Sequence, residues 1–411
     1  MKILMSIHHT MDKHAGAAGV TYKLAQAFRE QGHEVDMFSF DSLGKRASQF
    51  GAILFPWSVL LHVMRHPEYE VLDLSSGDGW VVNVLKRFGW RKKTVSVTRS
   101  HGLEHVVHEQ FVENCKKGEQ KKSWKYPIYH GGYRLWEVAM SFRHADAGLF
   151  LNQADREYAI TKLGVQRDKA ILVENGVDSI FVARAAATLT ALQAHDAVTS
   201  TAVSDAVTAA PLAAGVAAPA GSAIAARPRH IAFIGSNIFR KGITYFKAAT
   251  LQIMQRYPDI RVAFIGTGEK TGTDGILKDY PAALHSRIAV IPRYQNHALP
   301  ELLEGYGILG LTSISEGFSL VGVEAMASGL VPVCSRIPGP TEYIADERNG
   351  LLVEARNTTQ LVDAFTRLIE DEALWGRLHH AALETCERFS WQRIAAQQLS
   401  LFASLAKGLG R

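Results

Sequence analysis

The stretch that most constrains the fold runs from Thr312 to Val333. An apolar run before it predicts a buried strand, and Glu316 to Ser319 predicts a turn. Leu320 to Ser328 then predicts a helix, which Gly329 is placed to end. In an open parallel sheet, the turn of such a unit lies beyond the carboxyl ends of the strands, where ligands bind.

This turn favours an anionic ligand that also carries hydroxyl groups. Backbone N–H groups and the positive end of the helix dipole attract an anion such as a diphosphate. Glu316 and Glu324 bracket that position in the sequence. Carboxylates repel a phosphate unless each accepts hydrogen bonds from other groups, and sugar hydroxyls are suitable donors. The arrangement therefore suits a nucleotide-sugar.

The two glutamates stand in the run Glu-Gly-Phe-Ser-Leu-Val-Gly-Val-Glu-Ala-Met-Ala-Ser-Gly. This run resembles the signature of retaining GT-B glycosyltransferases of family 4 (glycosyl transferases group 1). The resemblance implies an α/β fold of two Rossmann-like domains, whose parallel sheets face each other across a cleft. It also implies that Glu316 contacts the donor hexose and that Glu324 holds the ribose. The implied donor-binding residues between them are Gly317, Phe318, Ser319 and Leu320. A plain strand, turn and helix with a solvated Glu316 is the simpler alternative.

Length and charge fit this interpretation. A chain of 411 residues is too long for one compact core and suits two domains. The formal charge of +5 is too small an excess to indicate a nucleic-acid partner. Three widely separated cysteines indicate neither a disulfide framework nor a cysteine-based metal site. We find no signal peptide and no run of about 20 apolar residues, so we expect a cytoplasmic protein.

The N-terminal part opens as a strand, helix and strand. Lys2 to Ile7 predicts a strand, His8 to Gly19 a loop, and Val20 to Gln31 a helix. The loop carries Gly16, and a glycine there lets a ligand approach the backbone closely. The family resemblance implies that Gly16 lies near the donor phosphate, although a plain tight turn is about equally favoured.

Two interpretations compete at His101. The run from His101 through Glu104 to His105 matches a zinc-peptidase motif, which needs both histidines on one helix. However, the preceding residues alternate as a strand and Gly102 follows directly, so we favour His101 at a strand end. The family resemblance then implies contact with the donor sugar and the acceptor. Arg99 is a weaker candidate for the same cleft.

Lysines and aromatic residues interleave from Cys115 to Trp136. Long basic side chains beside amphipathic rings suit an anionic membrane surface or a lipid-linked acceptor. A solvated loop that leads into a half-buried helix fits equally well. The first interpretation predicts weak contact with the inner face of a membrane.

The chain divides into four predicted parts. Composition sets off an Ala-rich flexible linker or insert over 183–228. The family resemblance implies an acceptor-side domain over residues 1–182, a nucleotide-sugar domain over 229–388, and a helix over 389–411 that crosses back to the first domain. The insert lacks a sustained apolar stripe and is predicted to bury little core, as a mobile linker that is partly helical because alanine favours a helix.

The run from Gly235 to Gly242 resembles the family's phosphate loop. The resemblance implies that Lys241 neutralises the diphosphate, while Ser236 stands where the family has an arginine. Arg240 is our candidate to replace that arginine. Arg293 is predicted on the nucleotide side of the site, and Gly235 in donor binding.

The function implied by the resemblance is transfer of a hexose from a nucleotide diphosphate sugar to a glycan or lipid-linked acceptor, with retention of configuration. His101, Arg240, Lys241 and Glu316 are the predicted catalytic residues. We expect no cofactor and no metal, because no Asp-x-Asp pair suits a sugar diphosphate. The alternatives are a GT-B epimerase or phosphorylase, or a catalytically silent module that binds nucleotide-sugars.

Overall fold

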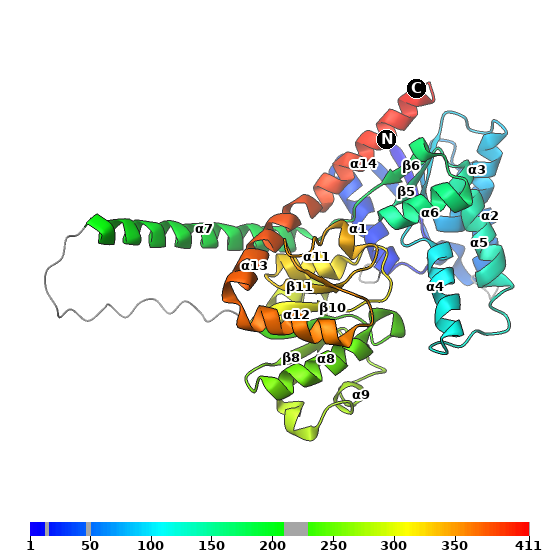
Figure 1. The fold of residues 1–411 in the computed structure, drawn as a ribbon. Helices are drawn as coiled ribbons and strands as arrows, with labels where there is room; N and C mark the ends of the chain where they lie inside the picture. Colours follow the sequence, from blue (N-terminus) through cyan, green and yellow to red (C-terminus); the bar gives the residue numbers. More distant parts are fainter. Residues whose placement is uncertain (13–15, 47–50, 209–228, 411) are drawn as a thin grey trace, which may run out of the picture.

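The structure is a computed structural model that describes residues 1–12, 16–46, 51–208 and 229–410. It contains two parallel sheets of six strands each, which confirms the predicted α/β fold (Figure 1). The first sheet has the order β2-β1-β3-β4-β5-β6. Its strands are β1 (Lys2–Ser6), β2 (Glu34–Phe38), β3 (Val71–Ser75), β4 (Val95–Arg99), β5 (Ala147–Phe150) and β6 (Ala170–Leu172).

The second sheet has the order β12-β11-β10-β7-β8-β9, so the strand order reverses between β7 and β10. Its strands are β7 (His230–Ile234), β8 (Val262–Ile265), β9 (Ile288–Ile291), β10 (Tyr306–Leu311), β11 (Val331–Ser335) and β12 (Leu351–Val353). Ligands bind in such sheets at the carboxyl ends of the strands that flank the reversal. The turns after β7 and β10 are the two that the sequence predicts to bind the diphosphate.

Helices cover both faces of each sheet. They are α1 (Gly16–Glu30), α2 (Gly51–Arg65), α3 (Trp80–Arg87), α4 (Glu104–Lys116), α5 (Arg134–His144), α6 (Gln153–Leu163), α7 (Ser179–Thr208), α8 (Ile243–Arg256), α9 (Asp274–Leu277), α10 (Leu299–Leu302), α11 (Leu320–Ala327), α12 (Thr358–Glu370), α13 (Glu372–Cys386) and α14 (Trp391–Gly408). Successive strand residues alternate between the faces. Thus Phe233 packs in one core with Phe246 of α8, whereas Ile234 packs in another with Met326 of α11.

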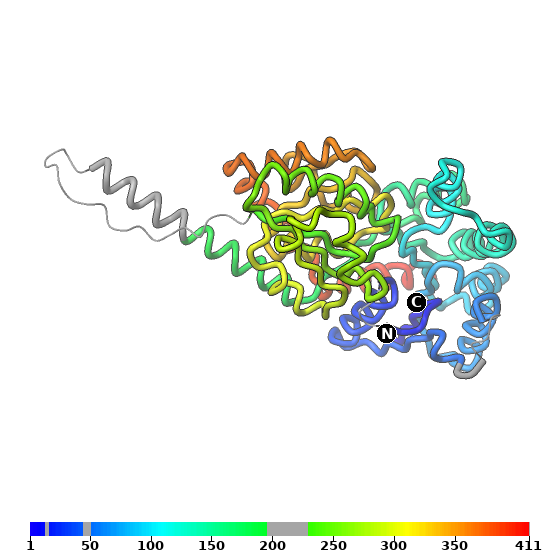
Figure 2. Tube along the Cα trace, turned by 90° about the horizontal axis from the view of Figure 1, so that it is seen from below, coloured from blue at the N-terminus to red at the C-terminus, as the bar shows by residue number. Residues whose placement is uncertain are grey.

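The last helix crosses back to the first domain. Phe402 of α14 packs edge-on against Phe28 of α1, with 5.9 Å between ring centroids. Figures 1 and 2 both show the two ends of the chain near each other. Gln398 of α14 accepts a hydrogen bond from Arg99, which is buried and paired with Asp73 of β3. Arg99 therefore binds the crossing helix and does not point into the cleft. The prediction of Arg99 as a second candidate for the cleft is wrong.

Two predicted loops are partly helical. The glycine loop is in part the first turn of α1, which begins at Gly16 with a φ of 36°. The predicted flexible insert begins inside α7, where Phe181, Ala185 and Leu189 are buried on one face. The insert is helical at its start, and the expectation that it buries little core is wrong for Ala185 and Leu189, because small alanines conceal a buried stripe with helical spacing. Residues 209–228 of the insert lie outside the described residues.

Candidate functional site

A cleft with a volume of about 570 Å³ lies between the two domains. It collects nearly all of the predicted site residues, although they come from four separate parts of the chain. Those that line it are Gly16, His101, Gly235, Arg240, Lys241, Glu316, Gly317, Phe318, Ser319, Leu320 and Glu324. Arg293 is not among them, since its side chain is 80% exposed and pairs with Glu269. Its neighbour Tyr294 lines the cleft instead.

Two cations and one carboxylate meet at the carboxyl end of β10. The Lys241 ammonium donates to Glu316 Oε1 at 2.5 Å, and Arg240 Nη1 donates to Glu316 Oε2 at 3.0 Å. Burial alone would raise the pKa of Glu316, but Lys241 and then Arg240 lower it below its ordinary value. Glu316 is therefore ionised and holds both cations at the cleft. Arg240 therefore reaches the cleft, where Ser236, at the position of the expected family arginine, supplies no charge.

The backbone fixes this group of charges in place. Gly242 ends the turn after Lys241 with a φ of 64°. A Cβ atom at Gly242 would lie 1.9 Å from the Thr312 carbonyl oxygen, so only glycine fits. The Thr312 hydroxyl also donates to the Lys241 and Gly242 carbonyl oxygens, at 3.2 and 3.1 Å. The phosphate loop and the end of β10 therefore form one rigid unit.

The second glutamate of the predicted site, Glu324, is buried within α11. Its Oε1 accepts a hydrogen bond from Asn296 Nδ2 at 2.8 Å. Burial raises the pKa of Glu324, and the Asn296 hydrogen bond opposes that rise. Asn296 also lines the cleft, and its buried Oδ1 has no hydrogen-bond partner in the structure. A buried pair with unused hydrogen-bonding capacity fits a ligand that carries hydroxyl groups.

The start of α11 has the features of an anion site. Ser319 precedes the helix with a φ of 68°, which is uncommon for a residue other than glycine. Its hydroxyl is buried and unpartnered, while its carbonyl oxygen accepts from Tyr343 at 2.8 Å. Leu320 and Val321 of the first turn line the cleft. Backbone strain and an unpaired hydroxyl at a helix start support ligand binding there.

His101 faces this site from the first domain. It precedes α4, so the helical spacing that the zinc-peptidase motif requires is not present. Its Nε2 lies 3.1 Å from the Ser75 hydroxyl. Burial, followed by the charge of Arg99, lowers the pKa of His101 to about 3, so the ring is neutral. Among the described residues, no three His, Cys, Asp or Glu side chains are grouped to hold a metal ion.

The two domains touch directly at Gly317. The Asn152 side chain of the first domain donates to the Gly317 carbonyl oxygen at 2.9 Å. A Cβ atom at Gly317 would lie 2.6 Å from the His101 carbonyl oxygen. This close approach explains why glycine follows Glu316, and it places His101 and Glu316 on opposite walls of one cleft.

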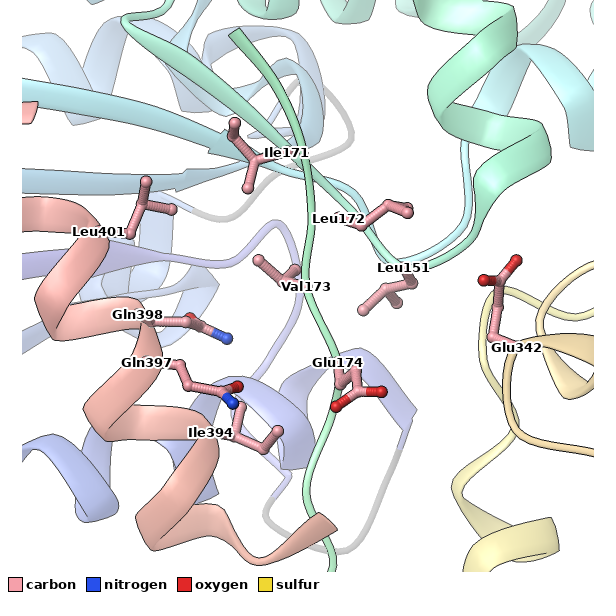
Figure 3. Close-up of a pocket in the computed structure, with 10 residues that line it drawn as sticks. All are labelled: Leu151, Ile171, Leu172, Val173, Glu174, Glu342, Ile394, Gln397, Gln398 and Leu401. Carbon is pink, nitrogen blue, oxygen red and sulfur yellow. The ribbon is translucent and has the colours of Figure 1, made fainter. Parts of the chain in front are cut away.

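A second cavity lies between the first domain and α14 (Figure 3). Its wall combines apolar side chains, among them Ile171 and Leu172 of β6 and Ile394 and Leu401 of α14, with the polar side chains of Glu174, Glu342, Gln397 and Gln398. It shares Leu151 with the cleft but contains none of the predicted site residues. Within the described ranges, no helix is both long and apolar enough to cross a bilayer.

Lys23 and Asn296 are among the polar residues of the cleft that sequence reasoning did not identify. Asn296 stands in a loop without periodicity, so nothing in the sequence marks it. Lys23 lines the cleft with Gly16, Gly19 and Val20, and these four positions share one face of α1. The helical spacing of these four positions could have identified Lys23 from the sequence. Lys23 is paired with Asp178 at 2.8 Å.

Two family models match consecutive regions of the chain. The model described as Glycosyltransferase Family 4 matches residues 14–180, and Glycosyl transferases group 1 matches residues 218–389. The second region contains Lys241, Glu316 and Glu324, and the first contains His101.

The chain spans less than half the length of the curated relatives that it matches. An uncharacterized glycosyltransferase of Methanocaldococcus jannaschii is 26% identical over 187 residues, which are 44% of this chain and 46% of that protein. A D-inositol 3-phosphate glycosyltransferase of Stackebrandtia nassauensis is 31% identical over 150 residues, or 35% of this chain and 34% of that protein.

Solved structures resemble the whole chain in fold. Sucrose-phosphate synthase of Thermosynechococcus elongatus has a TM-score of 0.72 at 18% identity, with 99% of both chains covered. HepE of Anabaena in complex with UDP has a TM-score of 0.67 at 18% identity, with 98% of this chain and 100% of that chain covered. The chain therefore consists of a region that matches the Glycosyltransferase Family 4 model followed by a region that matches the Glycosyl transferases group 1 model, on the fold that these solved structures share.

Proposed function

We propose that the chain transfers a hexose from a nucleotide diphosphate sugar to a glycan or lipid-linked acceptor, with retention of configuration and without a metal or cofactor. The observation that carries this proposal is the group formed by Lys241, Arg240 and Glu316 at the carboxyl end of β10. It lies in the same cleft as buried Glu324 and the start of α11.

The charges suggest how the donor binds. A diphosphate competes with Glu316 for Lys241 and Arg240, and the two cations stabilise the negative charge of the leaving group. Glu316 is then free to accept hydrogen bonds from hexose hydroxyls, while Glu324 and Asn296 hold the ribose. In a same-face mechanism, the acceptor hydroxyl attacks the sugar from the side on which the diphosphate departs. An oxygen of the leaving diphosphate then takes the proton of that hydroxyl. Neutral His101 contacts the sugar from the opposite wall.

A nucleotide-sugar that binds only the folded chain is expected to raise its melting temperature. A donor at about 100 times its Kd adds about 2.7 kcal/mol, which corresponds to a shift of roughly several degrees. We would test UDP-, GDP-, ADP- and TDP-sugars in the presence and absence of EDTA. The shift should survive EDTA and shrink in Glu324→Ala, which loses the buried carboxylate.

Glu301→Ala is the matched control, because Glu301 is exposed on α10 outside the cleft. A normal donor shift in Glu324→Ala would contradict the assignment of the ribose site. A shift that disappears with EDTA and returns with Mn²⁺ would contradict metal-independent binding.

A catalytically silent nucleotide-sugar module is the second candidate, and Ser236 is the observation that favours it. Ser236 lines the cleft as an uncharged residue at the position of the expected family arginine. Slow release of the nucleotide from the donor without any acceptor would exclude the silent module. Binding without any hydrolysis or transfer would support it.

We further propose a weak contact between the segment from Cys115 to Trp136 and an anionic membrane surface. Trp124 and Ile128 of this segment are exposed, and the Lys125 ammonium lies 5.4 Å from the Trp124 ring centre. The neighbouring helix α2 also exposes large apolar side chains, including Leu54, Trp57 and Met64. Apolar groups beside exposed cations are typical of an interfacial contact.

Changing the exposed residues Lys116, Lys117, Lys121 and Lys122 to glutamate is expected to weaken binding to anionic vesicles at least tenfold. Each basic residue near such a surface contributes about 1 kcal/mol. Vesicle sedimentation at low ionic strength measures the change, with zwitterionic vesicles as the control. Undiminished binding of the variant to anionic vesicles would refute the contact.

A further inference from the structure

One buried amide of α14 has a hydrogen-bond donor without a partner. Gln398 is 2% exposed, and its Oε1 accepts a hydrogen bond from Arg99 Nη2 at 2.7 Å. A guanidinium group only donates, so the amide oxygen faces Arg99 and the amide nitrogen faces away from it. That nitrogen, Nε2, is buried and makes no hydrogen bond within the described structure. Gln398 therefore has free capacity to bind an acceptor atom.

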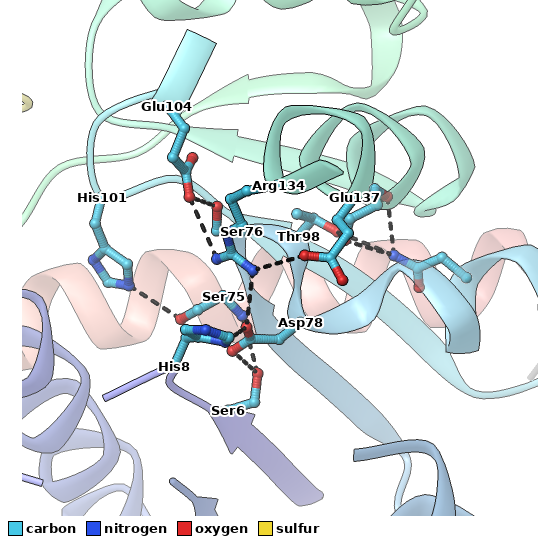
Figure 4. A network of polar contacts seen from close by, with 12 residues as sticks. Ser6, His8, Ser75, Ser76, Asp78, Thr98, His101, Glu104, Arg134 and Glu137 are labelled. Atoms are coloured by element: carbon cyan, nitrogen blue, oxygen red, sulfur yellow. Dashed lines mark hydrogen bonds and ion pairs between the residues drawn. The ribbon is translucent and has the colours of Figure 1, made fainter. Parts of the chain in front are cut away.

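The buried ion pair in Figure 4 is a different case. Both Glu137 carboxylate oxygens and Arg134 Nη1 also lack hydrogen bonds, but the two side chains pair with each other at 3.5 Å. Gln398 is uncharged, so no ion pair compensates for its unpartnered Nε2. Its amide instead lines the second cavity, the one between the first domain and α14, and Figure 3 shows the amide pointing into that cavity.

The second cavity joins an apolar wall to polar groups on two sides. Its volume is about 360 Å³, and small molecules typically bind in cavities of this size or larger. In Figure 3, Gln398 and the Glu342 carboxylate lie on opposite sides of the cavity. Six of the ten lining residues are aliphatic, namely Leu151, Ile171, Leu172, Val173, Ile394 and Leu401.

The ionisable side chains that line this cavity are both carboxylates. Glu174 pairs with Arg388 at 3.4 Å, which offsets its charge. Glu342 Oε1 accepts a hydrogen bond from the Gln153 backbone N–H at 2.8 Å. In the described part of the chain, the Glu342 carboxylate has no ion-pair partner. The cavity therefore attracts a cation and repels an anion.

The cavity is separate from the donor cleft and touches both domains. Its walls come from the end of the first sheet, from α14 and from Glu342 of the second domain, and it shares only Leu151 with the cleft. It lies beside the two places where the chain crosses between the domains, which are joined by a hydrogen bond from the Val177 N–H to the Phe389 carbonyl oxygen at 2.7 Å. An occupant of the cavity thus contacts both domains without using a predicted donor-binding residue.

We propose that this cavity binds a small amphipathic amine. The aliphatic part of the ligand covers the apolar wall, a carbonyl or hydroxyl oxygen accepts from Gln398 Nε2, and the ammonium group pairs with Glu342. A phosphate or a carboxylate compound does not fit, because the lining carboxylates repel it. A free sugar does not fit either, because the aliphatic side chains leave its hydroxyl groups without hydrogen bonds.

The test measures the Kd of matched probes for the full chain by isothermal titration calorimetry. The reference probe, 6-aminohexanamide, carries both polar groups of the proposed ligand, while 4-aminobutanamide and 8-aminooctanamide cover shorter and longer spans between them. Hexylamine lacks the amide, hexanamide lacks the amine, and adipamic acid carries a carboxylate in place of the amine. The best amino amide is expected to bind at least threefold more tightly than hexylamine or hexanamide, and adipamic acid more weakly than either.

Two variants assign the polar contacts. Gln398→Glu keeps an oxygen for Arg99 but removes the N–H donors, so it should weaken binding of the amino amide about tenfold and leave hexylamine binding no weaker. Glu342→Gln keeps an acceptor for the Gln153 N–H but removes the charge, so it should weaken binding of the amino amide about threefold and leave hexanamide binding unchanged. Glu354→Gln is the matched control, because Glu354 is exposed and pairs with Arg336 outside the cavity.

Failure of all three amino amides to bind the wild type at roughly 10 mM would overturn the ligand site. Unchanged binding of the amino amide in Gln398→Glu would overturn the amide contact, and equal losses for hexanamide and the amino amide in Glu342→Gln would overturn the ammonium contact. Glu324→Ala alters the donor cleft and should bind the probes as the wild type does; weaker binding there would place the probes in the cleft. No nucleotide-sugar is used, so a failure of this site and a failure of the proposed function are distinguishable.

Discussion

Replacing Lys241 by methionine is expected to lower the turnover of hexose transfer by about 10²- to 10³-fold. Lys241 lines the cleft with a side chain that is 16% exposed, and its ammonium contacts Glu316 at 2.5 Å. A cation in a partly dehydrated site stabilises the charge that develops on the departing diphosphate much more than water does. Methionine keeps most of the volume of the side chain and removes that charge.

Two further variants distinguish this role from a structural one. Lys247→Met is the matched control, since Lys247 pairs with Asp279 at 2.6 Å outside the cleft. It should leave turnover unchanged. Arg240→Met is expected to cost less than Lys241→Met, because the Arg240 side chain is 44% exposed. Turnover of Lys241→Met at the wild-type level, with the donor shift intact, would contradict the assignment.

The strands and the central helix could be predicted because their signals are local. The predicted helix from Leu320 to Ser328 corresponds to α11, Leu320–Ala327, since an apolar run and a following glycine define both of its ends. The start of α1 could not be predicted in the same way. Gly16 indicates a loop by its residue type, but it adopts a positive φ at the first position of the helix.

Contacts between distant residues explain the errors and omissions. Lys241 and Glu316 were each nominated from a local motif, but their ion pair joins positions 75 residues apart. Arg99 was expected in the cleft because it ends a strand, yet Asp73 and Gln398 draw it into the core. Only the fold brings Gln398 of the terminal helix to β4. No pattern in the sequence encodes that contact.

The buried pair between Arg99 and Asp73 is therefore expected to matter most for stability. Asp73→Asn should lower the free energy of unfolding by about 3–5 kcal/mol, because it leaves a charged guanidinium in the core without its counter-ion. Both side chains are 1% exposed, and Arg99 Nε donates to Asp73 Oδ1 at 3.1 Å. Urea unfolding followed by circular dichroism and tryptophan fluorescence measures the loss.

Two companion variants show whether the missing counter-ion is the cause. Glu113→Gln breaks the exposed pair with Lys117 on α4 and should cost no more than about 0.5 kcal/mol. The double variant Asp73→Leu with Arg99→Met removes both buried charges and should recover most of the stability that Asp73→Asn loses, because apolar replacement of a buried pair is often neutral. If Asp73→Asn were as stable as Glu113→Gln, the pair would not fasten α14 to the first domain. The crossing helix would then be held by its other contacts with the first domain, such as the packing of Phe402 against Phe28 and the hydrogen bond from Gln31 to the Gln392 carbonyl oxygen.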